Sequence, residues 1–193
     1  MLIYHPIKTI FTRVPGTASS SFITHMHKRW GEPEKIKIST APIQGMNNIS
    51  DNSHRTAHQL KLYLEEIGRQ HIWDEYEKIA FVRHPVAWTN SIFRKTGIPQ
   101  SIGENNKGSY RHYLESVDKT PYYWFTDPKG KVLVNYIFRT EDLDSEVFEI
   151  YGIAPPFSRH SVSRRPKFEP NEGDWKLLRK KFKREFAHYD NIP

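Results

Sequence analysis

The sequence predicts an α/β fold, P-loop-like, in which a central, mainly parallel sheet is the middle layer of a three-layer sandwich. Two observations predict it. Short segments typical of buried strands alternate with segments of helical periodicity, and no internal repeat or low-complexity tract interrupts them. The chain has 193 residues, so we expect a single domain spanning residues 1–193. Ligands of such sheets bind where strands end and loops lead into helix N-termini.

Four segments are expected to be strands. Residues 7–14 and 78–83 (KIAFVR) are short and rich in β-branched and aromatic residues, which is typical of buried strands. Residues 35–40 (KIKIST) alternate between apolar and polar side chains, as in a half-buried strand. The fourth segment, VLVNYIFR (132–139), follows DPKG (127–130), which has the composition of a tight turn.

Five segments are expected to be helices. In residues 18–30, apolar side chains recur every four residues from Phe22 to Trp30, and Gly31 ends the segment. Proline is well tolerated in the first turn of a helix, so Pro85 indicates a helix start. The full set of expected helices covers residues 18–30, 54–68, a segment from Pro85, about 110–117 and a segment from Asn171, with polar loops at 41–53 and 97–109.

Composition limits the classes of function. The formal net charge is +7, and the chain from Pro155 onward holds ten Lys and Arg against five Asp and Glu, so we expect an anionic partner. The absence of cysteine excludes disulfides and thiolate nucleophiles. No run approaches the ~18 apolar residues of a membrane span, and the N-terminal residues lack a secretory signal pattern. We therefore expect a cytoplasmic protein without a membrane span.

The segment FTRVPGTASSSF (11–22) predicts an anion-binding loop. An apolar strand breaks at Pro15-Gly16, and small residues then open a helix. Backbone N–H groups at a helix start lack intrahelical partners and lie at the positive end of the helix dipole. The hydroxyls of Thr17, Ser19, Ser20 and Ser21 are expected as further donors. The alternative is an ordinary capped helix after a β-turn.

The segment FVRHPVAWTNS (81–91) predicts a second anion site at the same edge of the sheet. A strand runs directly into Arg83, and Ser91 lies two turns into the next helix. The alternative is an arginine paired with a carboxylate and a surface serine. Two such sites at neighbouring strand ends are less probable by chance than either one alone.

In order along nearly the whole chain, these segments resemble the sulfotransferases that use 3′-phosphoadenosine 5′-phosphosulfate (PAPS), in particular the carbohydrate and bacterial branch. The family loop P-K-T-x-G-T-S, which binds the 5′-phosphosulfate, is similar to residues 15–21. The family motif V-R-x-P-x-x-x-x-x-S, which binds the 3′-phosphate, matches Arg83 and Ser91 at the same spacing. Three further segments agree: SHRTAHQLKLYLEE…WDEYEKIAFVRHP, TDPKGKVLVNYIFRTEDL and the basic RHSVSRRPKF (159–168).

The resemblance implies PAPS as donor and a set of residues that bind it. It also implies that RHSVSRRPKF (159–168) is a nucleotide clamp, with Ser163, Arg164 and Arg165 nearest the family pattern. The alternative is that this basic run is a solvated face. No metal is expected, because the spacing of the ten histidines suggests no ligand set. The implied binding residues are Pro15, Gly16, Thr17, Ala18, Ser19, Ser20, Ser21, Arg83, Ser91, Ser163, Arg164 and Arg165.

One departure from the family pattern concerns catalysis. Gly16 stands where the family loop has a lysine that stabilises the leaving nucleotide. If the rest of the site is intact, the variant Gly16→Lys is expected to raise sulfuryl transfer or PAPS hydrolysis. Arg13 is a candidate for the missing charge. The alternative is that Arg13 forms an ion pair with a Glu or Asp at the sheet edge. His54 is the expected general base, because the resemblance places a histidine there and a neutral imidazole accepts protons near pH 7. A helix cap is the alternative role, and His58 and Asp51 are the reserve bases.

The resulting expectation is a sulfotransferase that moves a sulfuryl group from PAPS to a hydroxyl or amine acceptor, with a carbohydrate as one candidate. Two alternatives remain: a non-catalytic relative that binds PAPS or its product PAP (3′-phosphoadenosine 5′-phosphate), and, with less support, a basic nucleic-acid-binding protein. The sequence does not identify the acceptor or the oligomeric state. Aromatic residues near the expected acceptor site either stack on a sugar or pack in the core: Tyr110, Tyr122, Tyr123 and Trp124.

Overall fold

The computed structural model describes residues 1–36, 54–95, 106–143, 145, 151–152 and 168–190. In this part of the chain a five-stranded sheet has the order β3-β1-β2-β4-β5. β4 pairs in parallel with β2 and β5, and β1 pairs antiparallel with β2 and β3, so every strand except β1 runs in one direction. The strands are β1 Leu2–Tyr4, β2 Thr9–Thr12, β3 Glu34–Lys35, β4 Glu77–Val82 and β5 Tyr136–Arg139.

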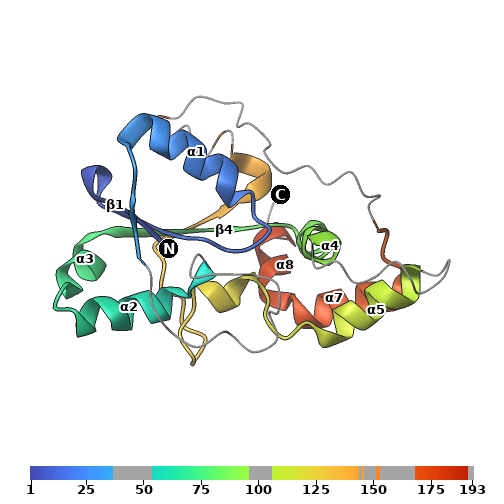
Figure 1. Cartoon of the computed structure of the whole chain (residues 1–193). Helices are drawn as coiled ribbons and strands as arrows, with labels where there is room; N and C mark the ends of the chain where they lie inside the picture. Colours follow the sequence, from blue (N-terminus) through green and yellow to red (C-terminus); the bar gives the residue numbers. More distant parts are fainter. Residues whose placement is uncertain (37–53, 96–105, 144, 146–150, 153–167, 191–193) are drawn as a thin grey trace.

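Helices cover both faces of the sheet, with α1 on one side and α2 and α3 on the other (Figure 1). Short 3₁₀ helices connect several elements: η1 His5–Ile7, η3 Pro121–Trp124 and η4 Thr140–Asp142. The α-helices are α1 Ser19–Trp30, α2 Ala57–Glu66, α3 Gln70–Glu75, α4 Pro85–Lys95, α5 Asn106–Ser116, α7 Glu172–Lys181 and α8 Lys183–Asp190. None of the helices in these described ranges combines the length and the hydropathy that a bilayer span requires.

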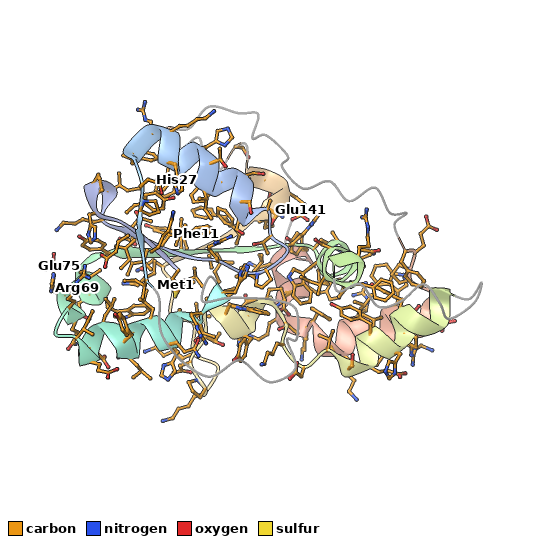
Figure 2. The ribbon with its side chains drawn as sticks, viewed as in Figure 1. Met1, Phe11, His27, Arg69, Glu75 and Glu141 are labelled. Atoms are coloured by element: carbon orange, nitrogen blue, oxygen red, sulfur yellow. The ribbon has the colours of Figure 1, made fainter. Side chains whose placement is uncertain are left out.

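Alternation along the central strands divides the core into two layers. On β2, Phe11 faces α1, where it packs edge-on against Phe22 of that helix at 4.9 Å between ring centroids (Figure 2). Its neighbour Ile10 belongs to the larger cluster on the opposite face, which also contains Leu60 of α2. Because the side-chain period of a strand is two, both faces of β2 are buried at once. The expected layered α/β architecture is thus present in the described residues.

Most expected elements are found, with shorter strands. The strand expected at 7–14 is β2, limited to Thr9–Thr12, and the strand expected at 132–139 is limited to β5. β1 was not expected, because Pro6 breaks the apolar run directly after it; Lys8 then adopts a left-handed conformation (φ 43°) that returns the chain into β2. The short helix α3 was also missed.

The remaining differences lie at helix ends and at β3. The last expected helix begins after Asn171, as predicted, but Phe182 separates it into α7 and α8. Only Glu34–Lys35 forms β3, and residues 37–40 of the expected strand lie outside the described residues. The same is true of the expected loop at 41–53 and of residues 97–105 of the second expected loop. The loop expected at 97–109 is therefore shorter at its end, because α5 already begins at Asn106.

A buried carboxyl joins the C-terminal helix to η3. Glu185 on α8 is 1% exposed, and its Oε1 accepts the backbone N–H of Tyr122 at 3.2 Å. Burial raises the pKa of the Glu185 carboxyl above its usual range. The folded state therefore binds this proton more tightly than the unfolded chain does, and ionising Glu185 at neutral pH weakens the fold.

We expect the variant Glu185→Gln to be more stable than the wild type at pH 7, since its amide keeps the acceptor oxygen and cannot ionise. The difference should shrink as the pH falls toward the ordinary carboxyl pKa, and each kcal/mol gained should raise Tm by about 2–4 °C. Thermal melts between pH 4 and 8 measure it. The matched control is Glu172→Gln, because the Glu172 side chain is 85% exposed and its melting should change little. Lower stability of Glu185→Gln at pH 7 would contradict this account.

Candidate functional site

The two predicted anion loops leave the sheet at the same edge and touch each other. β2 and β4 are adjacent and parallel, with Thr12 opposite Ala80, so the segments after both strands begin side by side. The second loop is residues 83–84, between β4 and α4. Its first residue is Arg83, whose Nη1 donates to the backbone oxygen of Gly16 at 3.1 Å. The prediction that Gly16 and Arg83 lie at one edge of the sheet is confirmed.

The first loop, defined here as residues 15–21, has an unusual backbone. Gly16 and Ala18 both have positive φ, at 78° and 55°. The buried Thr17 donates its hydroxyl proton to the carbonyl of Val14 at 2.8 Å, so this hydroxyl stabilises the loop rather than serving as a donor to a ligand. Pro15 is also buried, and Ser20 is the exposed serine at the start of α1.

Helix α1 begins without a capping side chain. Its N-cap residue is Ala18, whereas Thr56 and Asn171 cap α2 and α7 in capping boxes. Within the described residues, four backbone N–H groups of the loop donate to no protein acceptor: those of Gly16, Ala18, Ser19 and Ser20. Backbone donors of this kind need a partner, and at the positive end of a helix the best partner is an anion.

Helix α4 packs against the loop at Gly16. A Cβ atom at this position would lie 3.0 Å from Cδ1 of Ile92 and 3.4 Å from Cδ1 of Trp88. With the positive φ, this contact explains glycine here and works against a lysine, whose Cβ would displace Ile92 or the loop. Gly16→Lys therefore tests the tolerance of the backbone as well, and the expected gain in sulfuryl transfer stays a prediction.

Ser91 is placed by the same helix. It lies three residues after Trp88 and next to Ile92, and positions three or four residues apart share a helix face. Ser91 is partly exposed. Ser91 therefore lies on the same side of α4, the helix that contacts Gly16, as Trp88.

Glu141 holds the start of the second loop, which the sequence did not indicate. Its Oε1 accepts the backbone N–H of His84 at 3.2 Å, and its Oε2 accepts the hydroxyl of Tyr189 at 2.7 Å. Burial, followed by the neighbouring Glu141 carboxylate, raises the pKa of Tyr189, so its hydroxyl remains a donor. Figure 2 shows Glu141 at this edge and Arg69 and Glu75 at the opposite end of the sheet.

His54 lies beside the end of β2. Its Nδ1 is 2.9 Å from the carbonyl oxygen of Arg13, and Trp124 donates its indole N–H to the His54 carbonyl at 3.2 Å. Because a carbonyl only accepts, Nδ1 carries the proton, and Nε2 of the neutral ring carries the lone pair. This tautomer can take up a proton at Nε2. Arg13 is half-buried, and its backbone carbonyl positions His54.

The other predicted residues are accounted for as follows. Ser163, Arg164, Arg165 and Asp51 lie outside the described residues, and His58 is half-buried on α2. Tyr110 and Trp124 are fully buried and belong to the core, which excludes them from stacking on an acceptor. Arg184 lies 4.2 Å from the Tyr122 ring centroid and Lys119 4.9 Å from that of Tyr123. The described residues hold no group of three or more His, Asp or Glu side chains that suits a metal ion.

Comparison with protein-family models, with curated proteins and with solved structures found no match for this chain.

The close packing at Gly16 gives a stability prediction. The variant Gly16→Ala should lower the free energy of unfolding by the roughly 1–2 kcal/mol of a left-handed non-glycine residue, and further because of the Ile92 contact. Gly68→Ala is the matched control, since Gly68 also has a positive φ (71°) but has no atom within 4 Å of the added Cβ. Urea unfolding of both variants measures the difference. Equal losses would show that Ile92 does not restrict position 16.

Proposed function

We propose that this protein is a PAPS-dependent sulfotransferase that binds the nucleotide where β2 and β4 end and transfers its sulfuryl group to a hydroxyl or amine acceptor. The observation that carries the proposal is the hydrogen bond from Arg83 to the Gly16 carbonyl, which joins two anion-binding loops. The first loop offers backbone N–H donors and the second a guanidinium. A nucleotide with phosphates at both its 5′ and 3′ positions supplies one anion for each loop.

The proposed binding mode follows from the two loops. The N–H groups of Gly16, Ala18, Ser19 and Ser20 would hold the 5′-phosphosulfate, since they lack acceptors among the described residues. Arg83 would hold the 3′-phosphate with Ser91, while its Nη1 keeps the Gly16 carbonyl turned toward it. Backbone donors fixed before the ligand arrives need little reorganisation, which favours anion binding.

The proposed chemistry uses His54 as the base. When bound, PAPS supplies an activated sulfuryl group: the bond from sulfur to the acceptor atom forms as the bond from sulfur to the 5′-phosphate oxygen breaks, and PAP leaves. Nε2 of His54 would take the proton of the acceptor, because the Arg13 carbonyl keeps the other ring proton on Nδ1. The N–H groups of the first loop would stabilise the charge that develops on the departing phosphate.

A second function is favoured by one specific observation. Position 16 has no lysine, and its packing against Ile92 opposes one. Loss of a preorganised donor of this kind typically lowers a rate by about 10²–10³. A protein that binds PAPS or PAP without catalysis would keep the same two loops, so turnover is the measurement that separates the two functions.

The binding mode predicts that PAP binds more tightly than AMP, which lacks the 3′-phosphate. Loss of a charge-assisted hydrogen bond typically costs about 1.5–3 kcal/mol, so Arg83→Gln should weaken PAP binding by about one to two decades and AMP binding by less. Calorimetric titration with PAP, AMP and ATP measures this.

The matched control for Arg83→Gln is Lys8→Gln. Lys8 pairs with Glu75 at the opposite end of β2, and both side chains are more than half exposed. Its removal takes away the same charge from the protein and should leave PAP binding nearly unchanged. Equal affinities of the wild type for PAP and AMP would refute the assignment of Arg83 to a 3′-phosphate.

The mechanism predicts that His54→Gln lowers turnover by about 10²–10⁴ and leaves PAP affinity nearly unchanged, because the base contacts the acceptor and not the nucleotide. The rate of PAP release from PAPS, with water or added sugars as acceptors, is measured against pH, together with PAP affinity and Tm. In His54→Gln, the pH–rate profile should lose the limb near neutral pH that protonation of the base produces in the wild type. His58→Gln is the control, since His58 is the second residue of α2 and lies four residues after His54. Unchanged turnover per folded His54→Gln molecule would remove His54 from the mechanism.

A further inference from the structure

A tryptophan on α4 holds the carbonyl that precedes Gly16. Trp88 is 2% exposed, and its Nε1–H donates to the backbone oxygen of Pro15 at 2.7 Å, across 73 residues of sequence. The indole is fixed from its other side by aromatic neighbours, with ring-centroid distances of 6.4 Å to Trp124 and 5.7 Å to Phe182. The direction of the indole N–H is therefore set by the core.

This hydrogen bond determines where the first loop donor points. In a trans peptide the C=O and the following N–H lie in one plane and point in opposite directions. With the Pro15 carbonyl held toward the indole of Trp88, the N–H of Gly16 points away from it. That N–H is one of the four that donate to no acceptor within the described residues.

The next peptide plane is held in the same manner. The Gly16 carbonyl accepts from Arg83, so two successive carbonyls of the first loop are held by side chains from the strand end and helix that carry the second loop. Pro15 has no N–H of its own, and its carbonyl is therefore the one backbone group through which this residue can be held by a hydrogen bond. Removing the indole donor would leave the buried Pro15 carbonyl without its partner. The Pro15–Gly16 peptide plane could then rotate.

We propose that Trp88 is a positioning residue for the 5′-phosphate: it sets the direction of the Gly16 N–H without touching the ligand. The inference rests on the proposed function, because it assigns the first loop to the 5′-phosphate of a nucleotide. It differs from a packing role in one measurable respect. A packing role affects stability alone, whereas a positioning role affects the share of the affinity that the 5′-phosphate contributes.

The test compares Trp88→Phe with the wild type on three ligands. Phenylalanine keeps an aromatic ring in the core and removes the N–H donor. The ratio of the Kd of adenosine 3′-phosphate to the Kd of PAP measures the contribution of the 5′-phosphate. The ratio of the Kd of AMP to the Kd of PAP measures the contribution of the 3′-phosphate. We expect the first ratio to fall about three- to tenfold in Trp88→Phe and the second to stay unchanged, because a misdirected Gly16 N–H forms a weakened hydrogen bond to the 5′-phosphate.

The control is Trp73→Phe. Trp73 is a buried tryptophan (6% exposed) on α3, near the end of β4 that lies away from the two loops. It should change neither ratio, even where Tm falls as much as in Trp88→Phe. If Trp88→Phe does not fold, replacement of Trp88 by benzothienylalanine keeps the shape of the indole and removes only the N–H.

The outcomes separate the inference from the proposed function. An unchanged 5′-phosphate ratio in a folded Trp88 variant, with a wild type that gains affinity from both phosphates, would overturn the positioning role and leave the proposed function standing. A wild type that binds PAP no better than adenosine 3′-phosphate would overturn both. A fall of both ratios together would also contradict the inference, because it would show a general disturbance of the site.

Discussion

The hydrogen bond between Arg83 and the Gly16 carbonyl is the contact on which the candidate site depends. It spans 67 residues of sequence and forms because β2 and β4 are adjacent and parallel, so their ends deliver both loops to one edge of the sheet. Apolar side chains on both faces of β2 fix the register of that pairing, since a slip by one residue would turn Phe11 away from α1. Core packing thus determines the geometry of polar groups that contribute little to the core.

The first loop gives up stability that the other helix starts retain. Thr56 and Asn171 satisfy the first N–H groups of α2 and α7, whereas α1 follows Ala18 in a left-handed conformation and without a cap. A non-glycine residue in that conformation costs roughly 1–2 kcal/mol, and the loop N–H groups that have no acceptor among the described residues add to the cost. A local arrangement that is unfavourable for folding and favourable for an anion is typical of a binding site.

The sequence predicted the elements with strong periodicity or clear end signals, and it missed what depends on distant contacts. Phe22 and Met26 mark α1, and Asn171 marks the start of α7, because these signals act within a few residues. Arg83 and Gly16 were predicted at one edge from the order of strands and loops alone. No local signal reveals that Trp88 donates to Pro15 or that Glu141 accepts from His84, because these partners lie 73 and 57 residues apart in the sequence. The missed strand β1 is short, and its pairing with β2 becomes evident only from the turn at Lys8.

The contact of Glu141 with both His84 and Tyr189 has a consequence for the order in which the chain acquires its shape during synthesis. Strands β2 and β4 can pair once about the first half of the chain has left the ribosome, because their register needs no later residue. The N–H of His84 gains its carboxylate only after residue 141 emerges, and that carboxylate is fixed by Tyr189 on α8. The second loop is therefore completed only when both Glu141 and Tyr189 are present, after β2 and β4 have been made.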